Sequence, residues 1–280
     1  MTVADVSLGM RLKEQAGWNQ VEADWRRFLA MQPDGCFVAE LDGAPVGTAV
    51  GCVFGLVAWV AMVLVDEAVR GRGIGRALVE HAVSFVEGQG ARSVRLDATP
   101  LGRPVYEKLG FVPQFELTRY AATLDPRSCQ PHASLATQAS LRLALQDDYE
   151  AIFALDYAAT YSDRRKFLAL LFNERPAQVY VVDRERQVEG YLTIRHGSAA
   201  VQLGPCIANA EAGERLFGDA CRRLAGARVY LDVPCSHDRA VRLADSAGLE
   251  VQRTLTRMCR GAQVCEDVER LWASSGPELG

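Results

Sequence analysis

The stretch of residues 57–65 (VAWVAMVLV), followed after a short gap by residues 70–76 (RGRGIGR), decides how this chain is read. An unbroken apolar run rich in β-branched residues predicts a strand buried on both faces. A glycine-rich turn after such a strand can aim several backbone N–H groups at one point, and the helix expected next adds its positive end. With three arginines in the turn, this segment predicts a site for a phosphate-bearing ligand.

The composition of the chain is that of an ordinary globular protein: 280 residues, 49% hydrophobic, with a net charge of −4. This length predicts one large or two medium domains, each able to bury a core. The small negative charge gives no electrostatic support to a general nucleic-acid role. The longest apolar run is far below the ~20 residues that span a bilayer, and no signal peptide opens the chain, so we expect a cytoplasmic protein without a membrane partner.

The eight cysteines form no C-x-x-C pair and no cluster with histidine. We therefore expect reduced thiols and no metal site.

The first part of the chain predicts helices and strands in an α/β order. Helical character covers residues 6–13 and 20–31, and strands at 37–41 and 46–54 flank the Asp42-Gly43 hairpin turn. After the glycine-rich turn, apolar residues recur at helical spacing from Ile74 to Val86. The remaining elements are a strand at 93–97, a short helix at 103–109 and strands within 111–120. The order indicates a mixed sheet flanked by helices.

The second part repeats this order. Residues 121–137 contain two prolines and no periodicity, which is typical of a linker. Then come a strand, two helices, three strands, a helix, a strand and a short helix, within residues 141–248. Two local matches accompany the repeat: Thr118-Arg119 with Thr256-Arg257, each eight residues beyond a glycine, and Leu96-Asp97 with Leu231-Asp232. We interpret the two halves as a divergent duplication.

Two motifs at this separation resemble those of the GNAT N-acetyltransferase superfamily. The pattern Q/R-x-x-G-x-G/A is met by Arg70, Gly73 and Gly75, and the pattern Y-x-x-x-G-F by Tyr106, Gly110 and Phe111. A glycine loop alone is weak evidence, but the pair in this order is specific. The motifs cover residues 1–120, and the layout alone extends the resemblance to residues 140–260.

The resemblance implies an α/β (α+β) fold with two GNAT-like domains in tandem, each a mixed, mainly antiparallel sheet flanked by helices. We expect a catalytic, acyl-CoA-binding domain at 1–122, a linker at 123–137, a degenerate GNAT-like domain at 138–262 and a C-terminal tail at 263–280. The family's first strand has little room before Leu8: it is Thr2-Val3, is missing, or is lost to a misplaced start.

The resemblance also implies acetyl-CoA, or another acyl-CoA, as co-substrate. The backbone of the glycine loop would hold the pyrophosphate, and the end of the first long apolar strand would pair with the pantetheine arm. Thr99 stands where many relatives carry an asparagine that contacts this arm. The implied cofactor-binding residues are Val63, Leu64, Val65, Arg70, Gly71, Arg72, Gly73, Ile74, Gly75, Arg76, Thr99 and Tyr106.

Catalysis is assigned by the resemblance to two groups. The backbone N–H of Val63 would polarise the thioester carbonyl, and Tyr106 would act as general acid toward the leaving thiolate. The general base stays open, because the residue 57–65 strand holds no acid. Asp97, Glu40, Glu22 and His81 are the alternatives.

The acceptor side of such folds is built by the first two helices. Trp18, Asn19, Glu22 and Trp25 are the candidate substrate residues. The aromatic residues among them, with Phe28, also fit a helix that packs on its sheet, so both interpretations remain.

The second half lacks both chemical parts. Only Gly204 remains where the glycine loop would be, Pro205 removes a donor, and Ala244 stands in place of the tyrosine. We therefore predict an N-acyltransferase that acetylates a primary amine of a small molecule by direct attack, as a monomer or weak homodimer. The alternatives are an acetyl-CoA-binding sensor without catalysis and a protein or peptide N-acetyltransferase.

Overall fold

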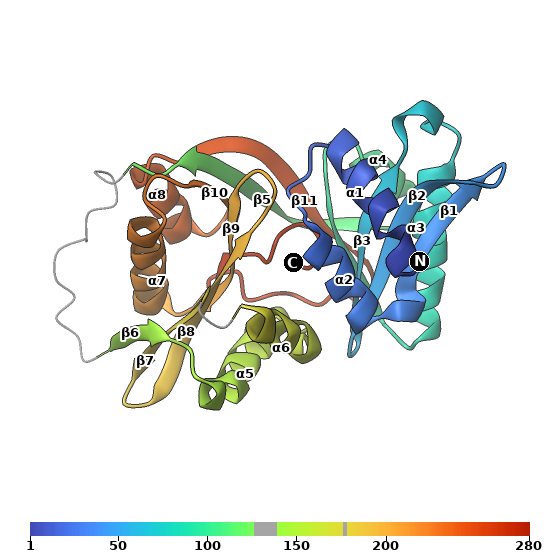
Figure 1. Cartoon of the computed structure of the whole chain (residues 1–280). Coiled ribbons are helices and arrows are strands. Elements are labelled where there is room, and N and C mark those ends of the chain that lie inside the picture. The colour runs from blue at the N-terminus through green and yellow to red at the C-terminus, as the bar shows by residue number, and fades with distance from the viewer. Residues whose placement is uncertain (126–138, 176–177) are drawn as a thin grey trace.

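The computed structural model of the chain describes residues 1–125, 139–175 and 178–280. Figure 1 shows two halves, each with helices against strands, joined by long strands that cross from one half to the other. The first half contains α1 (Val6–Gln15), α2 (Glu22–Met31), β1 (Cys36–Leu41), β2 (Ala44–Phe54), β3 (Val57–Val65), α3 (Ile74–Gly88), β4 (Ser93–Ala98), α4 (Arg103–Lys108) and β5 (Val112–Thr123).

The second half follows the same order. It contains β6 (Ser140–Leu143), α5 (Tyr149–Thr160), α6 (Arg165–Glu174), β7 (Val179–Arg184), β8 (Gln187–His196), β9 (Val201–Ala208), α7 (Ala210–Arg223), β10 (Arg228–Pro234), α8 (Asp238–Ser246), β11 (Glu250–Gly261) and β12 (Leu271–Ala273). The predicted mixed, mainly antiparallel sheet flanked by helices is confirmed in both halves.

The two halves exchange their long last strands and so share one sheet. Its strand order is β1-β2-β3-β4-β11-β5-β10-β9-β8-β7-β6. β11, from the second half, lies between β4 and β5, and β5 pairs with β10 of the second half. The expected boundaries at 122 and 262 therefore follow the chain but do not separate two closed sheets. β5 continues to Thr123, and most of the expected linker lies outside the described residues.

Each exchanged strand forms a buried ion pair with a strand of the other half. Arg119 of β5 lies opposite Asp232 of β10 and donates to its carboxylate at 2.7 and 2.6 Å. Arg257 of β11 lies opposite Asp97 of β4 and donates at 2.7 and 2.9 Å. The repeated Thr-Arg and Leu-Asp pairs in the sequence are therefore the two ends of reciprocal contacts between the halves.

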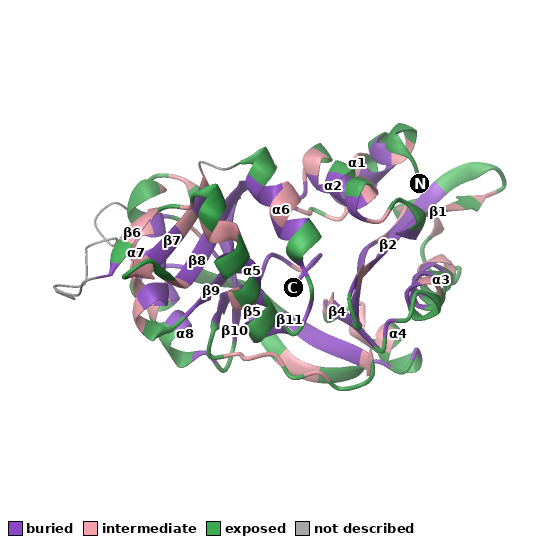
Figure 2. Cartoon of the chain, turned by 90° about the horizontal axis from the view of Figure 1, so that it is seen from below, coloured by how far each residue is buried: buried purple, intermediate pink, exposed green. Residues whose placement is uncertain are grey.

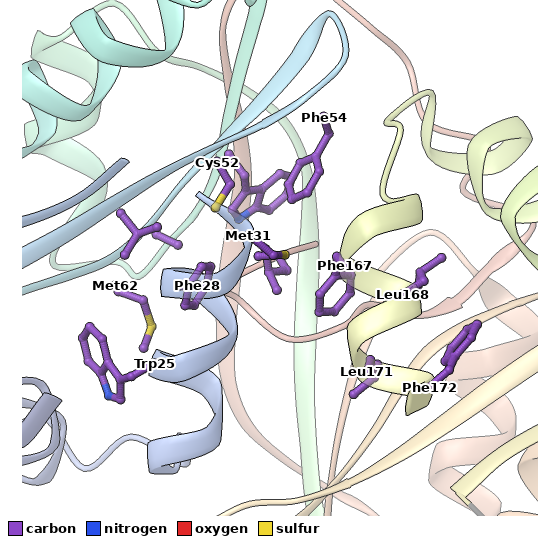
Figure 3. Close-up of a cluster of buried hydrophobic side chains, with 14 of the residues drawn as sticks. Trp25, Phe28, Met31, Cys52, Phe54, Met62, Phe167, Leu168, Leu171 and Phe172 are labelled. Atoms are coloured by element: carbon purple, nitrogen blue, oxygen red, sulfur yellow. The ribbon is translucent and has the colours of Figure 1, made fainter. Parts of the chain in front are cut away.

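A second contact between the halves is apolar. Phe28 and Met31 of α2 and Phe167, Leu168 and Leu171 of α6 belong to one buried cluster (Figure 3). Arg27, itself buried, reaches from α2 to Glu174 at 2.7 Å. The helices of one half thus share a core with those of the other, and the chain packs as one body.

The segment 263–280, expected to be a tail, is folded into the centre of the molecule. β12 pairs with β9, and Trp272, Ser274 and Glu278 are 4% exposed or less. The C-terminus lies between the two halves and within the buried region (Figures 1 and 2). Arg164 holds this segment by donating to the Leu279 carbonyl at 3.0 Å.

At the other end of the chain, Val3–Asp5 forms a 3₁₀ turn that leads into α1, so the first strand of the described residues is β1. In the part of the chain that is described, helices long and apolar enough to cross a membrane are absent. Cysteines there are free thiols, and Cys129 falls outside it.

Candidate functional site

One cavity of about 930 Å³ lies in the first half, along the open side of β3. β3 and β4 are paired in parallel only from Val57–Ser93 to Trp59–Arg95 and then separate. The cavity begins at the glycine loop, follows the separated ends of β3 and β4 past Tyr106, and ends at residues of β11 and the C-terminal segment. The predicted donor-site residues therefore line one space, with the exception of Arg72, which does not line it.

The glycine loop has the conformation of an anion site. Gly71 and Gly73 have φ of 80° and 84°, a region that other L-residues adopt only with strain. Gly73 opens α3 without a side-chain cap, and in the described residues the N–H groups of positions 71–76 donate to no acceptor. These donors and the positive end of the helix can hold a phosphate.

The arginines of the loop differ in how far they are engaged. Arg70 donates from Nε to the Val65 carbonyl at 3.0 Å, and Arg76 pairs with Glu80 at 2.9 Å. Arg72 is exposed and forms no ion pair within the described ranges. Arg70 and Arg76 line the cavity, whereas Arg72 lies outside its lining.

A β-bulge shapes β3 beside the cavity. Thr48 pairs with Leu64 and Val50 with Ala61, so Met62 and Val63 together face a single residue of β2. Met62 has a φ of 53°, and its carbonyl accepts the Thr48 hydroxyl at 2.9 Å. A bulge of this kind interrupts the ladder and re-aims the main chain. It brings the backbone of Val63 to the cavity, together with Leu64 and Val65.

Tyr106 enters the cavity from α4. Its ring packs edge-on against Phe111, with centroids 6.0 Å apart. Burial raises the pKa of Tyr106 to about 12, and its hydroxyl makes no hydrogen bond to any described residue. The phenol is therefore protonated at neutral pH and has a free proton to donate.

Thr99 lies in the same wall of the cavity and organises α4. Its Oγ1 accepts the Gly102 N–H at 3.2 Å, and its carbonyl accepts the Arg103 N–H at 2.9 Å. Both bonds cap the first turn of the helix that carries Tyr106. Thr99 thus has a structural task, and its contact with a pantetheine arm stays a prediction.

The structure brings only one of the four predicted acceptor residues, Trp18, to the cavity. Trp25 is fully buried against Gly9, where an added Cβ would lie 2.6 Å from the indole. Asn19 binds the backbone of Ala199 and Ala200 in the second half. Glu22 is exposed and pairs with Arg26.

The reason is that α2 turns its apolar face to the sheet and to α6, while the cavity opens at the end of α1. Asn19, Glu22 and Trp25 therefore lie outside the lining of this cavity, and their contact with a substrate stays a prediction.

The candidate bases are likewise not brought together. Glu40, Glu22 and His81 are exposed and do not line the cavity; His81 packs on Phe37. Asp97 lines it, but both its oxygens accept from Arg257. Burial raises the pKa of the Asp97 carboxyl, and the Arg257 guanidinium opposes this shift. Asp97 is first a structural partner of β11.

The sequence interpretation missed several residues that line the cavity. These are Gln15, Ala16, Gln20, Arg253, Leu255, Pro277 and Glu278. Glu278 is 4% exposed, and its carboxylate accepts from Arg195 at 2.7 Å and from Gln20 at 2.9 Å. Residues of β11 and of the last segment reach this place only because the halves exchange strands, which no local pattern indicates.

In the second half, the corresponding gap is filled by the chain itself. β9 and β10 pair in parallel only from Val201–Val229 to Leu203–Leu231. β12 occupies the space beyond, pairing with β9, and Ser274 donates to the Asp232 carbonyl at 2.9 Å. Because this gap holds protein, the two halves offer different surfaces to a ligand.

The start of α7 is also closed, whereas the start of α3 is open. The Asn209 side chain accepts the Ala212 N–H at 2.9 Å and caps the helix. Trp272 packs so closely on Gly213 that an added Cβ there would lie 2.0 Å from the indole. The capped and covered start of α7 agrees with the sequence of the second half, which lacks the glycine loop and the tyrosine.

Comparison with known proteins places both halves in one family. Residues 10–111 match the profile described as "Acetyltransferase (GNAT) family", and residues 152–273 match "Acetyltransferase (GNAT) domain". The chain is 26% identical over 235 residues to the uncharacterized N-acetyltransferase YitH of Bacillus subtilis (strain 168), covering 81% of this chain and 78% of that protein.

Two further similarities concern part of the chain and the fold. Over 86 residues, 27% of this chain and 52% of the relative, it is 41% identical to a protein of Oryza sativa subsp. japonica assigned as a glucosamine 6-phosphate N-acetyltransferase. A crystal structure of an assigned acetyltransferase from Pyrococcus horikoshii aligns with a TM-score of 0.82 and 19% identity, covering 100% of this chain and 94% of that one. The chain belongs to the GNAT acetyltransferase family, with two GNAT domains in tandem, and is an N-acetyltransferase.

Proposed function

We propose that the first half transfers the acyl group of acetyl-CoA to an amine of a small molecule by direct attack. The observation that carries the proposal is the single cavity shared by the glycine loop, the bulged end of β3 and Tyr106. Acetyl-CoA, the donor used by the GNAT family, supplies the activated acyl group.

The residues present fit this donor. The unpartnered N–H groups of positions 71–76 suit a pyrophosphate, and Arg70 and Arg76, which line the cavity, add positive charge. The edge of β3 beyond Trp59 is unpaired toward β4, so Val63, Leu64 and Val65 can pair with an extended arm as an added strand would.

Two groups then act on the reacting thioester. The Val63 N–H would donate to the carbonyl oxygen, where charge develops. Tyr106 would protonate the departing sulfur; with its pKa near 12 and a thiol near ~8.5, the transfer is coupled to bond cleavage rather than completed before it. In the described residues Asp97 and Glu278 are the carboxylates that line the cavity, so a water relay from the amine would end at one of them.

A small acceptor is favoured by how the second half closes the cavity. Pro277 and Glu278 occupy its acceptor end, where a peptide chain would need an open groove. The name of the Oryza sativa relative gives an amino sugar phosphate as the acceptor of that protein, which is consistent with a small molecule here.

One observation favours the alternative of an acetyl-CoA sensor. Both cavity carboxylates are held by arginines, Asp97 by Arg257 and Glu278 by Arg195, and neither is poised as a free base.

Thiol release from acetyl-CoA with an amine panel, in wild type and Tyr106→Phe, tests the proposal. We expect turnover in wild type and a loss of about 10²–10⁴-fold in kcat in the variant, with CoA affinity unchanged. Tyr157→Phe, at a tyrosine 55% exposed on α5, is the matched control. Full turnover in Tyr106→Phe contradicts the acid role; CoA binding without turnover on any amine supports the sensor.

A further inference from the structure

Arg253 is the feature of the cavity that the proposed chemistry does not use. It lies on β11, opposite Arg119 of β5 and next to a bulge at Gln252, and it lines the acceptor end. Its Nε is buried without a partner. Within the described residues the Arg253 side chain makes neither a hydrogen bond nor an ion pair.

The neighbouring arginines are different. Arg119 is held by Asp232 at 2.6 Å, and Arg195 by Glu278 and Asp24, each at 2.7 Å. Arg257 is held by Asp97 at 2.7 Å. The carboxylates around this part of the cavity are therefore already committed, and Arg253 is the cation there that lacks one.

An unmatched arginine in this position is unfavourable for the empty protein. Partial burial and the nearby charge of Arg119 lower the pKa of Arg253, while Asp232, Tyr230 and Glu278 oppose this shift. Arg253 is half-buried, and partial removal of a charge from water is costly without a directly bound counter-charge. An anion in the cavity would supply that counter-charge and accept hydrogen bonds from the N–H groups of the Arg253 guanidinium.

Gln20 adds a second unsatisfied group to the same wall. Its Nε2 donates to Glu278 at 2.9 Å, which orients the amide, and its buried Oε1 has no partner. Because Gln20 lines the cavity with Arg253, a ligand here meets one free cation and one free acceptor.

We propose that Arg253 binds an anionic group, a carboxylate or a phosphate, on the acceptor molecule, and so selects amines that carry a negative charge. Gln20 accepts an N–H or O–H of the same molecule. The inference rests on the proposed function, since it concerns the acceptor of that reaction. It makes a residue of the second half a specificity determinant for chemistry in the first.

The kinetic test uses acceptor pairs that differ in the anionic group alone. Butylamine with 4-aminobutyrate isolates a carboxylate, and ethanolamine with phosphoethanolamine and glucosamine with its 6-phosphate isolate a phosphate. For wild type we expect kcat/KM about 10–100-fold higher for the anionic member of at least one pair, as for a charge-assisted hydrogen bond. Arg253→Gln should bring that ratio within about twofold of one, mainly through KM.

Two control variants separate recognition from folding. Arg239→Gln removes an exposed arginine that pairs with Glu214 in the second half and should leave the acceptor ratio unchanged. Arg119→Gln strips Asp232 of its buried partner and should lower the Tm. Arg253→Gln, which removes an unpaired cation, should leave the Tm equal to wild type or higher.

A binding measurement decides the proposal without turnover. The protein is saturated with CoA, which fills the glycine loop, and its Tm is followed with added inorganic phosphate or acetate. The Tm should rise in wild type with at least one of these anions and not in Arg253→Gln.

The outcomes are distinguishable. Equal acceptor ratios in wild type and Arg253→Gln, or a Tm response that Arg253→Gln retains, overturn the anion site. A Tm loss in Arg253→Gln as large as in Arg119→Gln makes Arg253 a structural residue and also overturns it. If no amine is acetylated, the proposed function fails, while the response to phosphate or acetate still decides the anion site.

Discussion

The two halves of the chain share one order of elements but treat the same gap in opposite ways. In the first half, β3 and β4 separate around an open cavity, and α3 begins with an uncapped glycine loop. In the second, β12 fills the gap between β9 and β10, and Asn209 caps α7. The difference shows that one fold can either keep this gap open as a cavity or fill it with the chain's own last segment.

The largest expected effect is a loss of stability on removal of the buried aspartates, and we expect this loss to differ between the two halves. Among the described residues, Asp232→Ala leaves Arg119 with the Gln202 amide oxygen, at 3.5 Å, as its remaining side-chain hydrogen-bond partner, and should cost about 3–5 kcal/mol in the free energy of unfolding. Asp97→Ala should cost less, because Arg257 keeps Glu266 at 2.6 Å. Urea unfolding of both variants measures this, and an equal or larger loss in Asp97→Ala would refute the asymmetry.

Trp272 helps to fill the gap in the second half. Its removal tests whether this filling alone prevents CoA from binding there. Trp272 is 3% exposed and packs on His237 and Gly213, so Trp272→Ala should cost about 3–5 kcal/mol. The CoA stoichiometry should stay at one per chain by calorimetry, because Asn209 still caps α7. A stoichiometry of two would mean that the filled gap alone prevents binding.

A substitution in the glycine loop should affect the first half alone. Gly73→Ala forces a side chain into a φ of 84°, a strain of about 1–2 kcal/mol, and places a methyl group where phosphate would approach. We expect roughly tenfold weaker CoA binding by calorimetry. The control is Gly218→Ala inside α7, where the nearest atom, on Arg222, is 3.9 Å away; unchanged affinity in Gly73→Ala would remove the loop from the CoA site.

The smallest expected effect concerns pH. Because burial raises the pKa of Tyr106 to about 12, its protonated, donating form persists well above neutrality. Turnover should therefore show no fall between pH 8 and 10 that depends on Tyr106. A kcat profile with such an alkaline limb, lost in Tyr106→Phe, would mean that the phenol ionises at an ordinary pKa.

Local patterns predicted most of the elements, and the residues that they indicated for the donor, apart from Arg72, line one cavity. The strand at Val57–Val65, the glycine loop and the tyrosine four residues before Gly110 are close in sequence, and short-range chemistry determines their arrangement. The equivalence of Arg119 with Arg257 was also visible in the sequence. What remained hidden is that each pairs with the opposite half, because a last strand can complete either sheet with similar hydrogen bonds.

The acceptor side could not be predicted for the same reason. Arg253 and Glu278 come from segments far along the chain, and their approach to Trp18 depends on tertiary packing alone. Trp25 shows a second limit: helical spacing identifies an inward face but not whether that face meets a ligand or a neighbouring helix. The close approach of Gly9 to its indole, seen only in three dimensions, decides the matter.

The exchange of β5 and β11 has a consequence for how the protein is made. Arg257 lies 160 residues after its partner Asp97, and a ribosome adding about 5–20 residues per second needs roughly 10–30 s to cover that distance. Throughout this interval β4 lacks the strand that it pairs with in the finished sheet, and an unpaired strand edge is of the kind that templates aggregation. Synthesis of the chain therefore includes a window in which the donor site is already translated but its sheet is unfinished, and chaperone dependence should be concentrated there.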